Sequence, residues 1–235
     1  RIAYSPATVR HLLKNYGAHL DCLDRLAELD LAANPANEIE NFTVCLNEEF
    51  PNNAVLIKAQ WARSDFGRDI PVYDTDAAGL ERVIGPTKTA HWAEGDRRAN
   101  PGPDKIYTIR TRTGDRYRLV GLHIMTKELR HWVWVTLWWS DVPNIDFGAD
   151  RPTDLSDDLV WSNYKMAVVV DYTENTSDPG AGFDDMPTLQ NALNVDRDGL
   201  TWASNPYIEH GRGNARTNCI GCHQHGGSTV AFDQN

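Results

Sequence analysis

The chain has 235 residues and carries 33 Asp and Glu side chains against 23 Lys and Arg, which gives a net charge of −10. This negative charge argues against nucleic acid or an anionic membrane surface as a partner, and it favours a basic partner if another protein docks on the chain. No segment reaches the roughly 18 apolar residues that a membrane-spanning helix needs.

The first predicted element is a helix that begins at Pro6. Ser5 is a suitable N-cap, and proline is well tolerated at the first helical position. Apolar residues then recur at helical spacing until Asn34-Pro35, where we expect the helix to have ended. We expect the apolar face to pack on the core; its members are Val9, Leu12, Leu13, Tyr16, Leu20, Leu23 and Ala27.

The apolar period changes to two in the middle of the chain, which predicts β-strands. Turn signals such as Thr113-Gly114-Asp115 separate the strand candidates. The candidates are residues 54–61, 105–112, 116–125, 131–139 and 165–172. Two long connections, residues 85–104 and 141–158, interrupt them. The second contains six Asp residues, of which five are either solvated loop carboxylates or ligands of a calcium ion: Asp146, Asp150, Asp154, Asp157 and Asp158.

These elements predict an α+β fold with an antiparallel sheet or sandwich and an N-terminal helix packed on it. We expect residues 1–172 to form this body. Residues 173–235 are rich in Gly, Pro, Asn and Asp, so we expect an irregular C-terminal arm that packs on the body as part of one domain. A short helix near residues 214–223 would end the arm.

The arm contains the sequence Cys219-Ile220-Gly221-Cys222-His223. A Cys-x-x-Cys-His run is typical of c-type haem attachment, in which two thiols bond to the porphyrin vinyl groups and the histidine ligates iron. Cys219 and Cys222 are therefore the predicted haem-bonding residues, and His223 is the predicted proximal ligand of one haem c.

Three other interpretations of the motif remain open. The two thiols could form a redox dithiol, although that motif usually follows a strand in a βαβ setting. They could bind zinc together with His223 and His225, although structural zinc sites usually draw on two separated ligand pairs. They could also form a plain disulfide.

The remaining cysteines, Cys22 and Cys45, form an even pair, so a disulfide between them is plausible in an oxidising compartment; two buried thiols are the alternative. No apolar signal-peptide segment follows Arg1. Because haem c is attached outside the cytoplasm, we expect a periplasmic or secreted protein whose targeting segment is missing from this chain.

Two strand faces are candidates for a wall beside the haem, with a sheet packed on helices as the alternative. One comprises Tyr117, Leu119, Gly121, His123 and Met125, and the other Trp132, Trp134 and Trp138. No Met follows Cys222, so any distal iron ligand must come from upstream. We favour His123; the other candidates are Met125, Met166, Met186, His91, His131 and His210.

Four segments, in this order, resemble a group of bacterial proteins described as the "cytochrome c family": residues 54–61, 119–127, 131–139 and 218–225. Members of this group have a β-rich body and a single haem-attachment motif near the C-terminus. The resemblance implies a haem protein without naming a reaction.

The distal ligand separates the candidate functions. If protein fills both axial positions, the iron transfers single electrons, and the chain is a monohaem electron carrier. If the sixth position is open, a haem enzyme or small-ligand binder follows, with His91, His131 or arginines between residues 110 and 118 as acid–base groups. A third class is a binding or assembly module that haem stabilises.

Overall fold

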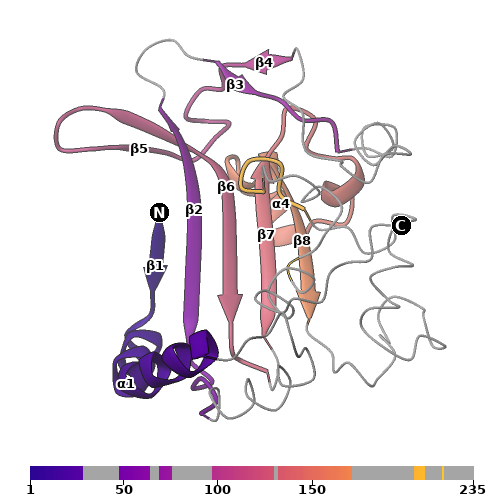
Figure 1. Ribbon diagram of the computed structural model, residues 1–235. Coiled ribbons are helices and arrows are strands. Elements are labelled where there is room, and N and C mark those ends of the chain that lie inside the picture. Colours follow the sequence, from indigo (N-terminus) through magenta and orange to yellow (C-terminus); the bar gives the residue numbers. More distant parts are fainter. Residues whose placement is uncertain are drawn as a thin grey trace, which may run out of the picture.

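The computed structural model describes residues 1–28, 48–63, 69–75, 97–129, 132–170, 204–209 and 219. Their central feature is a six-stranded antiparallel sheet in the order β1-β2-β6-β7-β8, with β5 paired to one end of β6 (Figure 1). The strands are β1 (Ile2–Tyr4), β2 (Val55–Arg63), β5 (Thr108–Arg110), β6 (Arg116–Thr126), β7 (Val133–Trp139) and β8 (Tyr164–Val170). The predicted antiparallel sheet is confirmed.

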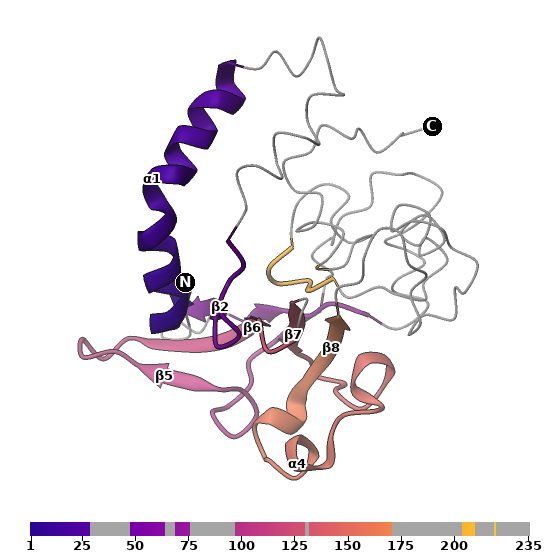
Figure 2. The ribbon, with the colours of Figure 1, turned by 90° about the horizontal axis from the view of Figure 1, so that it is seen from below.

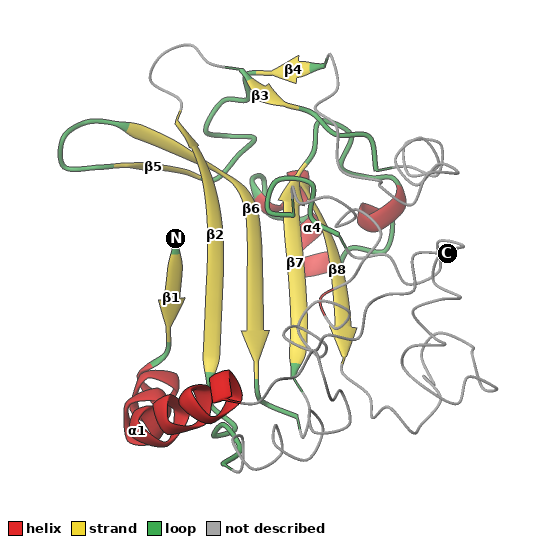
Figure 3. Cartoon of the chain, viewed as in Figure 1, coloured by secondary structure: helices red, strands yellow, loops and turns green. Residues whose placement is uncertain are grey.

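Smaller elements surround one end of this sheet (Figure 3). A separate two-stranded ladder joins β3 (Ile70–Pro71) to β4 (Arg98–Ala99). The connection between β7 and β8 contains two short 3₁₀ helices, η1 (Asp146–Gly148) and η2 (Trp161–Asn163), and one turn of helix, α4 (Thr153–Ser156). The described residues contain no second large sheet, so of the two predicted forms they show the single sheet and not the sandwich.

The sheet has two faces, because residues that lie directly opposite in neighbouring strands point the same way. One face carries an apolar row formed by Ile57, Ile124, Val135 and Val168. We call the other the Trp134 face. It comprises Leu56, Lys58, Gln60, Gly121, His123, Met125, Trp134, Thr136, Trp138, Lys165, Ala167 and Val169.

A β-bulge in the β2–β6 ladder corrects one prediction. Gln60 lies opposite Gly121, but the next residue of β2, Trp61, lies opposite Leu119. The extra residue in β6 reverses the alternation of its side chains. Leu119 therefore shares a face with Trp61, and the expectation that Tyr117 and Leu119 share the face of His123 is wrong.

Helix α1 (Pro6–Glu28) begins where the sequence predicts. The Ser5 hydroxyl accepts a hydrogen bond from the Thr8 backbone N–H at 3.2 Å, which caps the helix, and another from Val55 N–H at 3.1 Å. Thr8 is fully buried and its hydroxyl donates to the Val55 carbonyl at 3.2 Å. These polar contacts tie the first turn of α1 to β2.

The rest of α1 runs away from the sheet (Figure 2). Leu13 is 71% exposed and Tyr16 is 59% exposed. The expectation that the apolar face of this helix packs on the core is therefore wrong. The hydrogen bonds of Ser5 and Thr8 turn the polar side of the first turn toward the body, and the apolar side points elsewhere.

The β7–β8 connection is fastened to the Trp134 face by an ion pair and an aromatic contact. Lys165 Nζ donates to Asp146 Oδ2 at 2.8 Å and to Thr75 Oγ1 at 3.0 Å. The rings of Phe147 and Trp138 pack edge to face, with their centroids 5.2 Å apart. In the same connection, Asp158 Oδ1 accepts two backbone N–H bonds at the start of η2. Carboxylates of this loop therefore serve its own folding.

Candidate haem-binding surface

Cys219 is the described residue of the Cys-x-x-Cys-His motif, while Cys222 and His223 lie outside the described residues. The Cys219 side chain is buried, with 4% exposure, and packs against Trp134. The partly buried side chains around this pair are Met125, Trp132 and Val169. The Trp134 face thus gives the first cysteine of the motif an aromatic and aliphatic wall.

His123 lies on this same face, one side-chain repeat from Met125 along β6 and opposite Lys58 and Thr136 in the neighbouring strands. Its Nε2 atom is buried. Residues two apart along a strand are separated by about 7 Å. The structure therefore brings His123 to the sheet face that holds Cys219, a proximity that the sequence spacing of nearly a hundred residues does not reveal.

The other candidates for the distal iron ligand differ in the sheet face on which they lie and in whether the structure describes them. Met166 pairs with Leu137, so it lies on the opposite face of the sheet from Cys219. Met125 is in the cluster around Cys219. The candidates Met186, His91, His131 and His210 lie outside the described residues, and so does the predicted Cys22–Cys45 pair, since Cys45 and the Cys22 side chain are not described.

A turn formed by residues 204–209 covers the Trp134 face beside His123. Asn205 is fully buried, and its Nδ2 donates to Thr136 Oγ1 at 3.0 Å and to the Leu137 carbonyl at 2.8 Å. Its Oδ1 accepts the Tyr207 backbone N–H at 3.0 Å. Gly121 makes room for this turn, because a Cβ atom there would lie 2.9 Å from the Asn205 Oδ1 atom.

Sequence reasoning missed the docking role of this turn. The dipeptide Asn205-Pro206 signals a turn, but nothing in the sequence indicates that the amide group of Asn205 binds a strand far earlier in the chain. The Tyr207 hydroxyl extends the attachment by donating to the Pro71 carbonyl at 2.8 Å. Burial raises the pKa of this hydroxyl far above its usual value, so Tyr207 stays protonated and remains a donor.

Glu209 places an acidic group at the edge of this surface. Burial is the main cause that raises the pKa of its carboxyl from the usual 4.5 to about 7, while the backbone N–H of Asn205, the Ser204 side chain and the charge of Lys58 oppose the rise. Lys58 lies opposite His123 in the sheet. Glu209 therefore changes its charge near neutral pH beside the part of the Trp134 face that carries His123.

The chemistry of these groups fits a c-type haem. Thiols at a Cys-x-x-Cys spacing followed by His are the donor set for covalent attachment. The Trp and Met side chains around Cys219 offer the low-polarity contact that a porphyrin ring needs, and such surroundings also tune the reduction potential of the iron.

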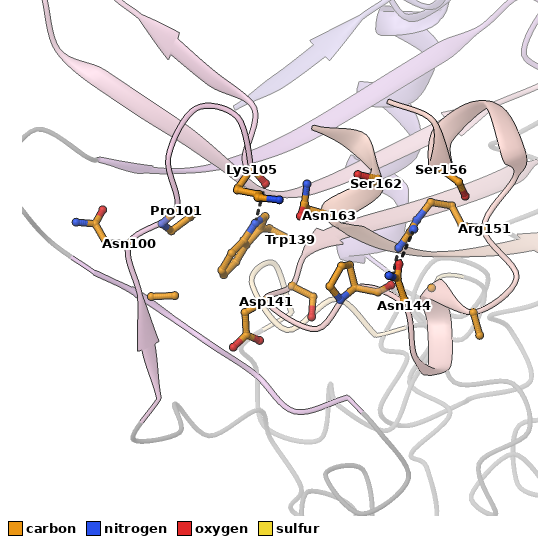
Figure 4. A pocket seen from close by; sticks show the side chains of 15 residues that line it. Asn100, Pro101, Lys105, Trp139, Asp141, Asn144, Arg151, Ser156, Ser162 and Asn163 are labelled. Carbon is orange, nitrogen blue, oxygen red and sulfur yellow. Dashed lines mark hydrogen bonds between the residues drawn. The ribbon is translucent and has the colours of Figure 1, made fainter. Parts of the chain in front are cut away.

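A separate polar pocket of about 850 Å³ lies at the other end of the sheet (Figure 4). Lys105, Trp139, Asn144 and Arg151 line it. The Trp139 indole donates to the Lys105 carbonyl at 3.0 Å, and Arg151 donates to Asn144 Oδ1 at 3.1 Å. These groups bind one another, and none of them is a residue that the haem prediction names.

The arginines proposed for acid–base chemistry also lie at this other end. Arg116 pairs with Arg110 in the β5–β6 hairpin, and the buried Arg118 donates to Asn100 Oδ1 at 2.7 Å. Met125 follows Arg118 by seven positions in β6, which corresponds to about 23 Å along the strand. These arginines therefore do not face the wall around Cys219.

Comparison with known proteins found no matching family model, no matching curated protein and no matching solved structure. Among the described helices, none has the length and apolar character to cross a membrane. The fold and the surface define a mainly antiparallel β protein with an N-terminal helix, and the resemblance to the "cytochrome c family" proteins stays a prediction.

Proposed function

We propose that this chain is a monohaem c-type cytochrome that transfers single electrons outside the cytoplasm. Cys219 and Cys222 would hold the haem covalently, and His223 would be its proximal axial ligand. The observation that carries the proposal is the Cys-x-x-Cys-His motif, whose first cysteine is buried against Trp134 on a wall of aromatic and aliphatic side chains.

The bound haem would supply the one-electron chemistry. The residues of the sheet would do the rest: Trp134, Trp132 and Met125 pack around Cys219 and would exclude water from the bound group, which would lower the polarity around it. Asn205 fastens the turn at residues 204–209 to β7, and Cys219 packs on the same Trp134 face.

His123 is the distal ligand that this proposal favours. It shares the Trp134 face with the cluster around Cys219, and its ring nitrogen Nε2 is buried. A histidine in both axial positions would leave the iron no open site for substrate, which favours an electron carrier over a haem enzyme. The negative charge of the chain favours a basic redox partner.

Covalent haem staining tests the proposal. The chain is expressed with an export signal in a bacterium that matures c-type cytochromes, and the denatured protein is separated on a gel and stained for haem. We expect staining of the wild-type chain and none of the Cys219→Ser/Cys222→Ser double variant. The matched control is Cys22→Ser/Cys45→Ser, which also removes two thiols and should keep the stain.

Two results would contradict the proposal. One is a wild-type chain that is exported and folded but carries no covalent haem. The other is a Cys219→Ser/Cys222→Ser variant that stains as strongly as the wild type, because a haem bond would then have to come from other residues.

A further inference from the structure

Three arginines lie on one face of the hairpin that β5 forms with the start of β6 (Figure 1). Arg110 of β5 lies directly opposite Arg116 of β6, and Arg118 follows two positions later in β6. Residues that are directly opposite in an antiparallel pair, or two apart in one strand, point to the same face. The three guanidinium groups are therefore neighbours on that face.

The register of the hairpin brings the first two of these arginines close together. The Thr111 N–H bonds to the Asp115 carbonyl at 2.8 Å, so these two residues form a hydrogen-bonded pair. Such pairs alternate with non-hydrogen-bonded pairs along an antiparallel ladder, which makes Arg110 and Arg116 a non-hydrogen-bonded pair. Their Cα atoms are then about 4.5 Å apart, and like charges placed directly opposite each other destabilise a sheet.

The described carboxylates near the hairpin act on other arginines. Asp115 forms an ion pair with Arg63 at 2.8 Å. Burial lowers the pKa of the Arg118 guanidinium, and the negative charge of Asp69 opposes that shift. Within the described part of the chain, no carboxylate forms an ion pair with either member of the opposed arginine pair. A bound anion would therefore relieve a repulsion that these carboxylates leave in place.

A pocket of about 540 Å³ opens beside the hairpin, and all three arginines line it. Its volume lies in the range of about 300–1,000 Å³ that is usual for small-molecule sites. Arg118 is 2% exposed, and its Nη1 donates to Asn100 Oδ1 at 2.7 Å. This bond fixes one wall of the pocket. The described lining contains three guanidinium groups and no carboxylate.

We propose that this pocket binds a phosphate group with two negative charges, as the free ion or as a monoester of a small molecule. The planar guanidinium group donates paired N–H groups that match phosphate oxygens. Three such groups offset by the charge of Asp69 leave two positive charges, which a dianion balances and a single carboxylate does not. The site is local, because the chain as a whole has a net charge of −10 and repels anions.

The apolar part of the pocket favours the monoester over the free ion. Pro101 and Pro103 line it together with the arginines. Their rings offer a surface for the organic part of a small phosphate ester, whereas the free ion has no such part. We therefore expect a monoester to bind more tightly than inorganic phosphate.

This site is separate from the haem proposal. Arg118 is seven positions before Met125 in β6, or about 23 Å along the strand, and Met125 belongs to the cluster around Cys219. Binding of phosphate can therefore be measured whether or not the chain carries haem.

Isothermal titration calorimetry of the full chain with methyl phosphate tests the site. At about pH 8 this probe is a dianion, because the second pKa of a phosphate monoester is about 6. Inorganic phosphate and acetate are titrated in parallel at the same ionic strength, since salt screens exposed charges. We expect one saturable site for methyl phosphate, weaker binding of inorganic phosphate and much weaker binding of acetate.

One substitution removes a single guanidinium group from the pocket. Arg116→Gln keeps a polar side chain and should raise the dissociation constant for methyl phosphate at least about tenfold, as expected when a hydrogen bond between charged groups is lost. Arg112→Gln is the matched control, because Arg112 is exposed in the turn of the same hairpin and lies outside the described lining of the pocket. It should change the dissociation constant less than about threefold.

Urea unfolding without phosphate separates a binding role of Arg116 from a structural one. Because Arg116 lies opposite Arg110, its replacement by Gln removes a repulsion. The midpoint of Arg116→Gln should therefore equal that of the wild type or exceed it.

Three results would overturn the proposal. The first is that neither methyl phosphate nor inorganic phosphate binds saturably, or that acetate binds as tightly as they do. The second is that Arg116→Gln binds methyl phosphate like the wild type. The third is that Arg116→Gln lowers the urea midpoint, because the arginine pair would then support the fold. Tighter binding of inorganic phosphate than of methyl phosphate would support the phosphate site and overturn the preference for an ester.

Discussion

The buried ion pair between Lys165 and Asp146 offers a quantitative test of the fold. Lys165 is 1% exposed, and its ammonium group donates hydrogen bonds to Asp146 at 2.8 Å and to Thr75 at 3.0 Å. Asp146→Asn removes the compensating charge but keeps the size of the side chain. It also keeps a residue that tolerates the left-handed backbone at this position, where φ is 46°.

Removing one partner of a buried ion pair costs about 3–5 kcal/mol. Because Thr75 still accepts a hydrogen bond from Lys165, we expect Asp146→Asn to lower the free energy of unfolding by about 2–3 kcal/mol, at or just below the lower bound of that range. For a chain of this size the loss corresponds to a fall in Tm of about 4–12 °C.

Urea unfolding of four proteins measures the effect: wild type, Asp146→Asn, Lys165→Met and the double variant. The double variant should be closer to the wild type than Asp146→Asn is, because no uncompensated ammonium group is then buried. Glu48→Gln is the control at an exposed ion pair and should change stability little. A loss below about 1 kcal/mol for Asp146→Asn, or a double variant as unstable as the sum of the two singles, would refute the reasoning.

Three further predictions concern the turn at residues 204–209. The pKa of Glu209 is raised from 4.5 to about 7 in the folded state, so the stability that this shift contributes is complete below pH 4.5 and is lost as the pH rises through 7. Glu209→Gln should remove up to about 3 kcal/mol of this pH dependence. Urea unfolding at several pH values measures the effect, and the control Glu128→Gln, at an exposed position, should leave the pH dependence unchanged. Gly121→Val should cost about 1–3 kcal/mol in the same assay, because its side chain would collide with Asn205 and Ile208, and an unchanged midpoint would contradict the docking of the turn. Asn205→Ala should cost about 2–3 kcal/mol, since it leaves buried partners without their hydrogen bonds; a loss confined to a few tenths would show that the amide group is not buried there.

The sequence predicted the strands well because their alternation is strong and local. The predicted strand at residues 54–61 matches β2 (Val55–Arg63), and that at 116–125 matches β6 (Arg116–Thr126). The strand predicted at 105–112 is shorter in the structure, Thr108–Arg110, because the Lys105 and Ile106 N–H groups both bond to the Gly102 carbonyl in a turn. The short strands β1, β3 and β4 have too few residues to show a period.

The faces of elements were harder to predict than the elements. Alternation alone placed Leu119 with His123, whereas the bulge opposite Gln60 and Trp61 separates them. Helical period correctly found an apolar side of α1, but it contains no information on what covers that side. The hydrogen bonds of Thr8 to β2 decide it, and they depend on a segment almost fifty residues away.

The candidate site was predicted in its chemistry but not in its surroundings. The Cys-x-x-Cys-His spacing marks Cys219 from five residues of sequence, because covalent attachment fixes that spacing. The burial of Cys219 against Trp134 depends on side chains from β6, β7 and β8, which no local pattern brings together. The same holds for Asn205, whose side chain attaches the turn at residues 204–209 to β7.

The optical spectrum of the natively matured protein tests the central claim most directly, recorded oxidised and reduced, with and without carbon monoxide. We predict the bands of a c-type haem in both states and no change with carbon monoxide, as expected for an iron with both axial positions filled by protein. A spectrum that shifts with carbon monoxide would contradict the electron-carrier assignment by showing an open or displaceable site. A matured and folded chain without haem bands would contradict the haem proposal itself, and Cys219 and Cys222 would then belong to a disulfide, a redox dithiol or a zinc site.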